Sequence, residues 1–241
     1  SIGISHYPGD GSDPDALIKN ADIAMYKAKG NGRNTYYLFN QKLNEQLVEH
    51  LDLENDLRNA VNHDLLDLYY QPQVELRNGK WKGIEALLRW EHPELGYIPP
   101  DKFIAVAEET GLIIKIGYWV IYRACRQYLQ LKDMGHVVGR MALNLSPHQF
   151  LQSNLVEKIK EILSETGMSP HDLELELTES AAMPNLEYSI KTLQALQDMG
   201  VNISIDDFGT GFSSLSHLQK MPIDTIKIDR SFVMDTPGDP D

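Results

Sequence analysis

The chain is 241 residues long and carries 35 acidic against 22 basic side chains, for a formal net charge of −13. That balance argues against a protein that binds DNA or RNA polymers, because such affinity comes from a basic surface; a small phosphate ligand stays possible if bound cations reverse the local potential. The length suits one barrel-sized domain plus a fragment. Cys125 is the only cysteine, and the most apolar region, residues 112–122, is too short to span a bilayer. We therefore expect a cytoplasmic protein without disulfides.

The first 62 residues predict a small α/β fragment and a connecting helix. A strand is expected at residues 1–5, after which Asp13 and Pro14 supply a helix N-cap and a first-turn proline. Gly30 ends this helix, whose apolar stripe is formed by Leu17, Ala21, Ala24, Met25 and Ala28. Apolar residues then recur from Leu43 to Val61, which indicates a second helix that links to the next domain and packs against it.

From Leu66 onward, candidate strands alternate with candidate helices. Strands are expected at residues 66–74, 82–90, 140–145, 173–178, 201–206 and 225–228, and helices at 100–110, 113–134, 155–166 and 186–199, with a shorter one near 213–218. This alternation predicts a mostly parallel sheet with helices outside it. Asn78-Gly79 is a hairpin signal, so the first two strands are expected to be antiparallel. The predicted fold class is α/β. We expect an α/β barrel, and an open doubly wound sheet is the alternative.

Polar residues interrupt the apolar pattern of these strands. Ile84, Ala86, Leu88 and Trp90 share one parity of the second strand, whereas Glu85 and Arg89 lie on the other. If the apolar parity packs against the helices, the polar parity faces the barrel interior. Carboxylates in such an interior are costly unless they are paired or bound to metal.

The stretch from residue 203 to 211 ends a β-branched run in two adjacent aspartates and a glycine-rich turn. Asp206 and Asp207 could be a solvated turn that caps a helix, but polar residues near the ends of other strands favour a metal site. The whole set comprises Glu85, Asn144, Glu176, Asp206, Asp207 and Lys227. Barrel enzymes keep their sites at the carboxyl ends of strands, and oxygen ligands without cysteine or histidine favour Mg²⁺ or Mn²⁺.

Two ordered series of motifs resemble known families. Residues 1–39 resemble the C-terminal end of a GGDEF (diguanylate cyclase) domain through Ser1-Ile2-Gly3-Ile4-Ser5, Ala21-Asp22-Ile23-Ala24-Met25-Tyr26 and Gly32-Arg33-Asn34. Residues from about 53 to 233 resemble the EAL family of cyclic-di-GMP phosphodiesterases through Gln71-Pro72, Glu85-Ala86-Leu87, Asn144-Leu145-Ser146, Glu176-Leu177-Thr178-Glu179, Asp206-Asp207-Phe208-Gly209 and Lys227-Ile228-Asp229. We expect a GGDEF fragment at 1–39, which lacks the cyclase signature, a linker helix at 40–62 and an EAL-like domain at 63–241.

The EAL resemblance implies a role for each matching residue. Glu85, Asn144, Glu176 and Asp206 would hold one metal, and Asp206 and Asp207 would share a second. Lys227 would hold the nucleophilic water or stabilise phosphate charge, so that the catalytic set is Lys227, Glu85, Asp206 and Asp207.

The resemblance also implies contacts around the metals. Arg89, beside Leu88, would contact a substrate phosphate, and Gln71 would contact the ligand more loosely. Glu179 would anchor the loop at residues 207–214, which couples metal binding to dimerisation in such proteins. We therefore expect a homodimer formed through the EAL domain.

The function implied is metal-dependent hydrolysis of cyclic-di-GMP to the linear dinucleotide pGpG in bacterial signalling. The alternatives are a regulatory domain that binds cyclic-di-GMP without cutting it, and a hydrolase of another phosphoester. The partners expected upstream in the parent protein are a GGDEF domain and a sensor domain, and the parent is expected to lie at the cytoplasmic face of the inner membrane if it has an anchor. The family barrel has eight strands, whereas six are expected before Asp241. We therefore expect the barrel's C-terminal end to be missing here and this chain alone to be inactive.

Overall fold

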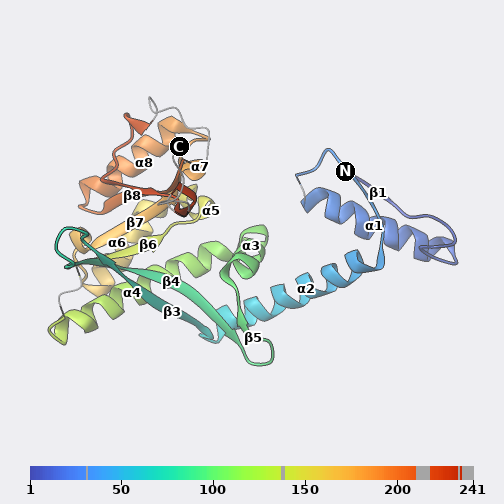
Figure 1. The fold of residues 1–241 in the computed structure, drawn as a ribbon, viewed down its shortest axis with the longest axis horizontal. Helices are drawn as coiled ribbons and strands as arrows, with labels where there is room; N and C mark the ends of the chain where they lie inside the picture. The colour runs from blue at the N-terminus through green and yellow to red at the C-terminus, as the bar shows by residue number, and fades with distance from the viewer. Residues whose placement is uncertain (31, 137–138, 210–217, 233, 235–241) are drawn as a thin grey trace. The chain divides into compact units, whose positions relative to one another are not determined.

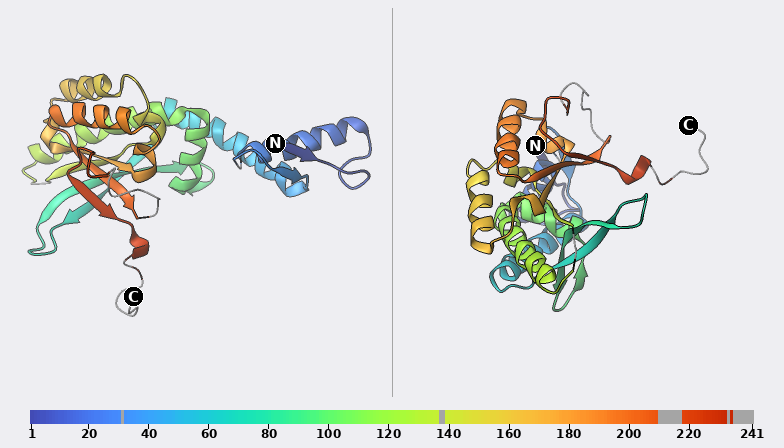
Figure 2. Two further views of the ribbon diagram at one scale, coloured as in Figure 1. Left: turned by 90° about the horizontal axis from the view of Figure 1, so that it is seen from above. Right: turned by 90° about the vertical axis from the view of Figure 1, so that its left-hand side faces the viewer.

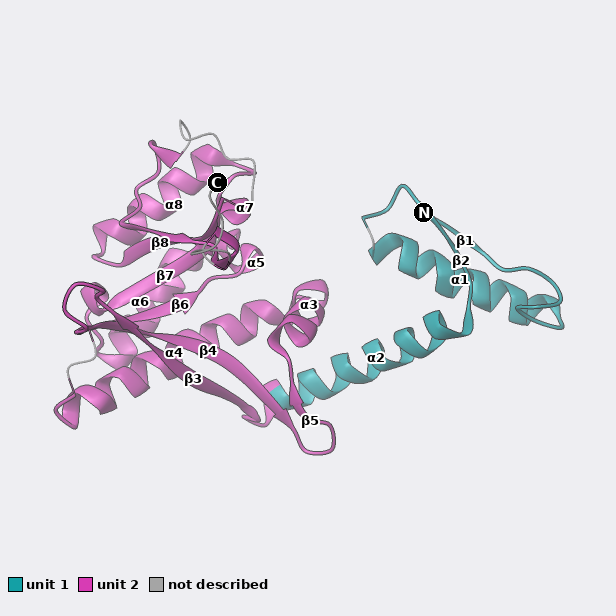
Figure 3. Ribbon diagram, viewed as in Figure 1, with its two compact units in different colours: residues 1–60 teal, residues 61–241 magenta. Residues whose placement is uncertain are grey.

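The computed structural model describes residues 1–30, 32–136, 139–209, 218–232 and 234. The chain divides into two compact units, residues 1–60 and 61–241, and each is considered by itself (Figure 3). Across the described residues, no helix is both long enough and apolar enough to cross a membrane.

The first unit pairs two short strands and packs them with helices. Its elements are β1 (Ile2–Ile4), α1 (Pro14–Gly30), β2 (Tyr36–Leu38) and α2 (Gln41–Asn62), the last of which ends just beyond the unit boundary. β1 and β2 are parallel. A Cβ atom on Gly3 would lie 1.8 Å from the Ala21 carbonyl oxygen, so only glycine allows β1 to lie this close to α1. Ile23, Ala24 and Leu43 form the core of the unit.

The second unit is built on a seven-stranded sheet (Figure 1). Its strands are β3 (Leu66–Val74), β4 (Trp81–His92), β5 (Gly96–Ile98), β6 (Arg140–Asn144), β7 (Leu173–Thr178), β8 (Asn202–Phe208) and β9 (Thr225–Ile228). The order is β3-β4-β6-β7-β8-β9, with β5 paired to β4. β3 and β5 are antiparallel to β4, the former as the Asn78-Gly79 hairpin predicts, and β4, β6, β7, β8 and β9 run parallel to one another.

Helices cover one face of this sheet. They are α3 (Pro100–Thr110), α4 (Leu112–Asp133), α5 (Pro147–Phe150), α6 (Leu155–Thr166), α7 (Glu179–Ala182) and α8 (Leu186–Asp198), with short 3₁₀ turns at Pro170–Asp172 and Arg230–Phe232. Figure 2 shows α4, α6 and α8 along the outside of the strands. Trp90, on the apolar parity of β4, is fully buried and meets Phe103 of α3 edge-on, with ring centroids 5.6 Å apart. The apolar parity therefore faces the helices, and the polar parity faces away from them.

The architecture fits the expected (β/α) barrel, of which the described strands form an open part. The main expected strands and helices are present within a few residues of their predicted bounds. Sequence reasoning missed β2, β5, α5 and α7, each of three or four residues. The short helix expected near residues 213–218 lies almost entirely outside the described residues. β3 and β9 are the two ends of the described sheet.

Candidate active site

The expected site residues come from five neighbouring strands. Glu85 lies in β4, Asn144 ends β6, Glu176 lies in β7, Asp206 in β8 and Lys227 in β9. Asn144 is directly opposite Glu176 in the register of β6 and β7. Because side chains alternate along a strand, each of these residues points to the face opposite its apolar neighbours in the strand. The sheet therefore gathers them on the face that the helices leave uncovered.

Lys227 is the centre of this group. Its Nζ lies 2.5 Å from Oε2 of Glu176, 3.0 Å from Oδ2 of Asp206 and 3.4 Å from Oε2 of Glu85. Asn144 Nδ2 donates to the second oxygen of Glu85 at 2.9 Å. One ammonium group and one amide thus join side chains from β4, β6, β7, β8 and β9.

Burial sets the electrostatics of the group. The Glu176 side chain is 0% exposed, compared with 16% for Glu85 and 22% for Asp206. The pKa of Glu176 is raised to about 7, chiefly by removal from water and also by the charges of Glu85 and Asp206, while the hydrogen bond from Lys227 acts in the opposite direction. Glu176 therefore holds its proton more tightly than an ordinary glutamic acid does.

The ammonium of Lys227 is stabilised in its charged form. Burial disfavours the charge, but the hydrogen bond to Glu176 and the attraction of the three carboxylates outweigh that effect and raise the pKa above its ordinary value. Oε1 of Glu176 is buried and has no hydrogen-bond partner among the described residues. A buried carboxylate oxygen without a partner is costly, so this atom has unused capacity to bind a donor or a cation.

The group fits a hard divalent cation by its chemistry. Three carboxylates converge from neighbouring strands, with the Asn144 amide beside Glu85, and Mg²⁺ and Mn²⁺ prefer the oxygen ligands that such side chains supply. Within the described ranges, no three His, Cys, Asp or Glu side chains are already arranged to hold an ion. Instead the positive charge among Glu85, Glu176 and Asp206 is the ammonium of Lys227.

Asp207 directly follows Asp206 in β8. Its backbone has a φ of 53°, in the left-handed region that few residues other than glycine adopt, and its N–H donates to Oδ1 of Asp206 at 2.9 Å. Burial, then the charges of Asp206 and Asp229, raise the pKa of its carboxyl group. Asp229 was missed by the sequence reasoning, although it directly follows β9 and so obeys the same strand-end rule that identified Asp206. Asp206, Asp207 and Asp229 therefore form a second group of carboxylates, next to the group around Lys227.

Glu179 and Gln71 lie around the centre. Glu179 begins α7, is buried, and accepts a hydrogen bond from the N–H of Gly209 at 3.4 Å. This contact is at the start of the loop that Glu179 is expected to anchor, and residues 210–214 of that loop lie outside the described residues. Gln71 of β3 is directly opposite Glu85. Its side chain therefore shares the face of the sheet that carries Glu85.

Arg89 and Leu88 do not contact the carboxylate group. Arg89 Nη1 donates to the Leu88 carbonyl oxygen at 2.9 Å, and its guanidinium carbon lies 5.5 Å from the ring centroid of Tyr69 in β3. Arg89 is directly opposite Asp67, four residues along β3 from Gln71. The predicted phosphate-binding arginine is therefore separate from the predicted metal ligands but lies on the same face.

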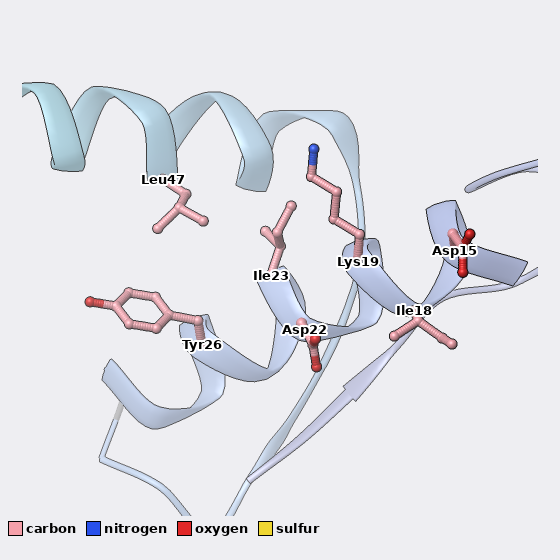
Figure 4. A pocket seen from close by; sticks show the side chains of 7 residues that line it. All are labelled: Asp15, Ile18, Lys19, Asp22, Ile23, Tyr26 and Leu47. Carbon is pink, nitrogen blue, oxygen red and sulfur yellow. The ribbon is translucent and has the colours of Figure 1, made fainter.

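A further hollow of about 430 Å³ lies inside the first unit, between α1 and α2 (Figure 4). Leu47 of α2 faces Ile23 and Tyr26 of α1 across it, and Asp15, Ile18, Lys19 and Asp22 complete the lining. None of the residues expected to bind metal or ligand lines this hollow.

The comparison with family models now identifies the class of protein. The model described as "EAL domain" matches residues 54–241, and that described as "Diguanylate cyclase, GGDEF domain" matches residues 1–35. The chain belongs to the EAL domain family and carries a piece of a GGDEF domain at its N-terminal end.

Particular relatives share much of this sequence. The chain is 48% identical over 241 residues to the bifunctional diguanylate cyclase/cyclic di-GMP phosphodiesterase MucR of Pseudomonas aeruginosa, a match that covers 100% of this chain and 35% of that protein. It is 42% identical over 238 residues to the cyclic di-GMP phosphodiesterase NbdA of the same organism, covering 99% of this chain and 30% of that protein. The chain thus spans about a third of the length of these curated relatives.

A solved structure is similar as well. The PaMucR phosphodiesterase in complex with c-di-GMP superposes with a TM-score of 0.75 at 47% identity, covering 78% of this chain and 76% of that one. Over 78% of its length, this chain is thus similar in fold to a relative whose structure was solved in complex with c-di-GMP.

Proposed function

We propose that this chain is the EAL part of a cyclic-di-GMP phosphodiesterase, which hydrolyses one phosphodiester bond to give linear pGpG. The observation that carries the proposal is the convergence of Glu85, Glu176 and Asp206 on one point of the sheet. Three like charges at one place are unfavourable unless a positive group is present, so the arrangement is suited to cation chemistry. The two curated relatives described above carry the phosphodiesterase name.

The cofactor we propose is Mg²⁺ or Mn²⁺ in a two-cation site. Glu85, Asn144, Glu176 and Asp206 would hold one ion, and Asp206 and Asp207 would share the second. When bound, such ions supply positive charge at the phosphate and make water more acidic. The orphaned Oε1 of Glu176 supports this assignment, because that atom has no other partner among the described residues.

The remaining roles belong to side chains of the chain itself. Lys227 would hold a proton at Nζ and place positive charge beside the attacked phosphate, since its pKa is raised by the surrounding carboxylates. Arg89 has the planar fork that binds phosphate oxygens in pairs, and Gln71 lies opposite Glu85 where it can contact the ligand. Orientation of the phosphodiester by these groups would lower the barrier to in-line displacement.

The alternative function, a receptor that binds cyclic-di-GMP without cutting it, has less support than the enzyme. A domain that only binds the nucleotide has no need of a complete ligand set, whereas Glu85, Asn144, Glu176 and Asp206 are all present and Lys227 contacts three of them. A hydrolase of a different phosphoester would share this centre, so the substrate is the part of the proposal that requires the direct assay.

The test is a turnover assay with the intact protein that contains this chain. Incubated with cyclic-di-GMP and Mg²⁺ or Mn²⁺, it should produce linear pGpG, detected by liquid chromatography. Glu85→Ala and Asp206→Ala should abolish turnover, because each removes a proposed metal ligand. Glu187→Ala is the matched control, since Glu187 is an exposed carboxylate on α8 paired only with Lys191 among the described residues.

Two results would contradict the proposal. Turnover that persists after exhaustive chelation would exclude the role of a divalent cation, and near-normal turnover by either alanine variant would exclude the assigned ligands. Hydrolysis of other phosphoesters with no action on cyclic-di-GMP would leave the metal centre in place and overturn the substrate.

Two expectations from the sequence extend this proposal. The EAL unit is expected to form a homodimer, with the Glu179-anchored loop coupling the metal site to its interface. The protein is expected to act in the cytoplasm, or at the cytoplasmic face of the inner membrane if the parent protein is anchored. Both are checked on the intact protein, by light scattering and by cell fractionation.

A further inference from the structure

Tyr69 is a large aromatic residue on the face of the sheet that carries the carboxylate group. None of the roles described so far explains its presence there. It lies in β3 opposite Leu87, two residues before Gln71, which is opposite Glu85. Directly opposed residues of antiparallel strands place their side chains on the same face, so Tyr69, Gln71 and Glu85 share one face. Tyr69 is nevertheless 56% exposed, so core packing does not account for it.

The partner of Tyr69 is Arg89. The guanidinium carbon of Arg89 lies 5.5 Å from the centroid of the Tyr69 ring, a distance at which the ring attracts the cation. Arg89 Nη1 also donates to its neighbour's carbonyl oxygen at 2.9 Å. In the part of the chain that the structure describes, no carboxylate forms an ion pair with Arg89. The arginine is thus held by an aromatic ring and one backbone oxygen.

This kind of support leaves the charge of Arg89 available. A carboxylate partner would neutralise the guanidinium and occupy its fork, and would compete with a phosphate for the same N–H groups. An aromatic ring restricts the guanidinium without accepting its hydrogen bonds. The guanidinium has five N–H donors, and its bond to the Leu88 carbonyl uses one of them.

We propose that Tyr69 is a positioning residue for Arg89, whose guanidinium it holds in place so that the free N–H groups bind a phosphate of the cyclic dinucleotide. The inference rests on the proposed function and deepens it. Tyr69 acts through Arg89 and supplies affinity for the phosphate; it takes no part in the bond-breaking step.

The first test measures binding to the intact protein by calorimetry, with cyclic-di-GMP as the probe and Ca²⁺ in place of Mg²⁺ to limit turnover. Tyr69→Leu should raise the dissociation constant about two- to five-fold, the fold-change expected from an exposed cation–π contact. Tyr69→Phe keeps the ring and should bind as the wild type does. Tyr97→Leu is the matched control, because Tyr97 is 57% exposed in β5 of the same sheet.

The second test separates positioning from other roles by a double-mutant cycle. In an Arg89→Ala background, Tyr69→Leu should have no further effect on affinity, because the group through which Tyr69 acts is gone. An effect that persists there would overturn the inference, since it would mean a direct ligand contact or a general effect on the fold. In turnover assays, Tyr69→Leu should raise KM with kcat little changed, as expected for lost ground-state binding.

Measurements on the wild-type protein distinguish a failure of the proposed function from a failure of the role assigned to Tyr69. If it binds and hydrolyses cyclic-di-GMP but Tyr69→Leu has wild-type affinity, the role of Tyr69 is wrong and the proposed function stands. If the wild type neither binds nor hydrolyses cyclic-di-GMP, the proposed function and this inference both fail.

Discussion

Lys227 is the residue on which the site's balance of charge depends. Its ammonium lies within 3.4 Å of carboxylates from three other strands. Removing it would leave Glu85, Glu176 and Asp206 facing one another without a counter-charge, and part of the cost would be relieved by protonation of Glu176, whose pKa is already about 7. The site therefore needs either Lys227 or a bound cation to keep its carboxylates ionised.

Lys227→Ala should lower kcat much more than it changes the affinity for cyclic-di-GMP. The reason is that Nζ is proposed to stabilise charge that develops during the reaction, and such interactions raise kcat. Steady-state kinetics with Mg²⁺ measure the first quantity, and calorimetry with Ca²⁺ measures the second. A variant with wild-type kcat would remove Lys227 from the catalytic set.

Arg89→Lys should weaken the binding of cyclic-di-GMP although it conserves the charge. An ammonium is a point charge, and it lacks the planar fork that binds two phosphate oxygens and stacks on the Tyr69 ring. We expect a loss of roughly 1.5–3 kcal/mol in binding free energy, the range for hydrogen bonds to charged groups. Calorimetry that gives wild-type affinity would show that Arg89 does not bind the phosphate through its fork.

Cys125 should be inert in the folded protein. It is fully buried in α4, and burial raises the pKa of its thiol to about 12, with a hydrogen bond to Thr166 acting in the opposite direction. The thiolate is the reactive form, so at pH 8 both access and ionisation oppose reaction. Ellman's reagent should label the native protein very slowly and should label one thiol per chain in urea. Rapid labelling of the native protein would mean that α4 opens readily.

The site residues could be predicted from the sequence to an uneven extent. Glu85, Glu176 and Asp206 interrupt apolar strands. Burying a carboxylate is costly, so their presence in the alternation pattern is by itself a signal of a functional site. Tyr69 carries no such signal, because a tyrosine in a strand is ordinary; its contact with Arg89 depends on the register of β3 against β4. Asp229 had a signal, its place directly after β9, but charged residues after strands are common enough to pass unnoticed.

At the scale of the element, long strands and helices were predictable and short ones were not. β7 places Leu173, Leu175 and Leu177 on one parity and Glu174 and Glu176 on the other, and this pattern gave both the strand and the site. β5 has three residues and exists because a tight turn at Gly96, with a φ of 67°, returns the chain to Trp90 of β4. Three residues cannot display a period, so no local pattern could reveal β5.

Gly3→Ala should disrupt the packing of β1 on α1. The new Cβ would lie 1.8 Å from the Ala21 carbonyl oxygen and 2.3 Å from the Met25 backbone nitrogen, and neither backbone atom can move without displacing the helix. We expect a loss of stability of about 1–3 kcal/mol, as for other overpacked sites, seen as reduced amide protection in α1 by hydrogen exchange. Gly30→Ala is the control, because a Cβ there meets nothing within 4 Å. Equal protection in the two variants would contradict the close approach.

At the scale of the whole molecule, the second unit presents two unpaired sheet edges among its described strands. β3 pairs only with β4 and β9 only with β8 on this sheet. On β9 the apolar residues Ile226 and Ile228 are 45% and 66% exposed. Open edges with apolar side chains pair readily with other chains.

We expect the 241-residue chain to self-associate, with a mass above that of one chain by light scattering. Ile228→Lys should reduce the association, because it places a charge on the exposed face of β9. Ile18→Lys in α1 is the matched control, since Ile18 is 62% exposed in the other unit and belongs to no sheet edge. A monomeric wild type would show that these edges are protected in solution.

The contact between Lys227 and Glu85 also has a consequence for biosynthesis. The two residues are 142 positions apart, so at 5–20 residues per second the ribosome adds the lysine roughly 7–30 s after the glutamate. During that interval Glu85, Glu176 and finally Asp206 are synthesised without the ammonium that neutralises them. The repulsion between these carboxylates opposes the pairing of the strands that carry them. The nascent EAL unit should therefore keep this face open until β9 has left the exit tunnel, and a divalent cation in the cell could take the place of Lys227 before the lysine exists.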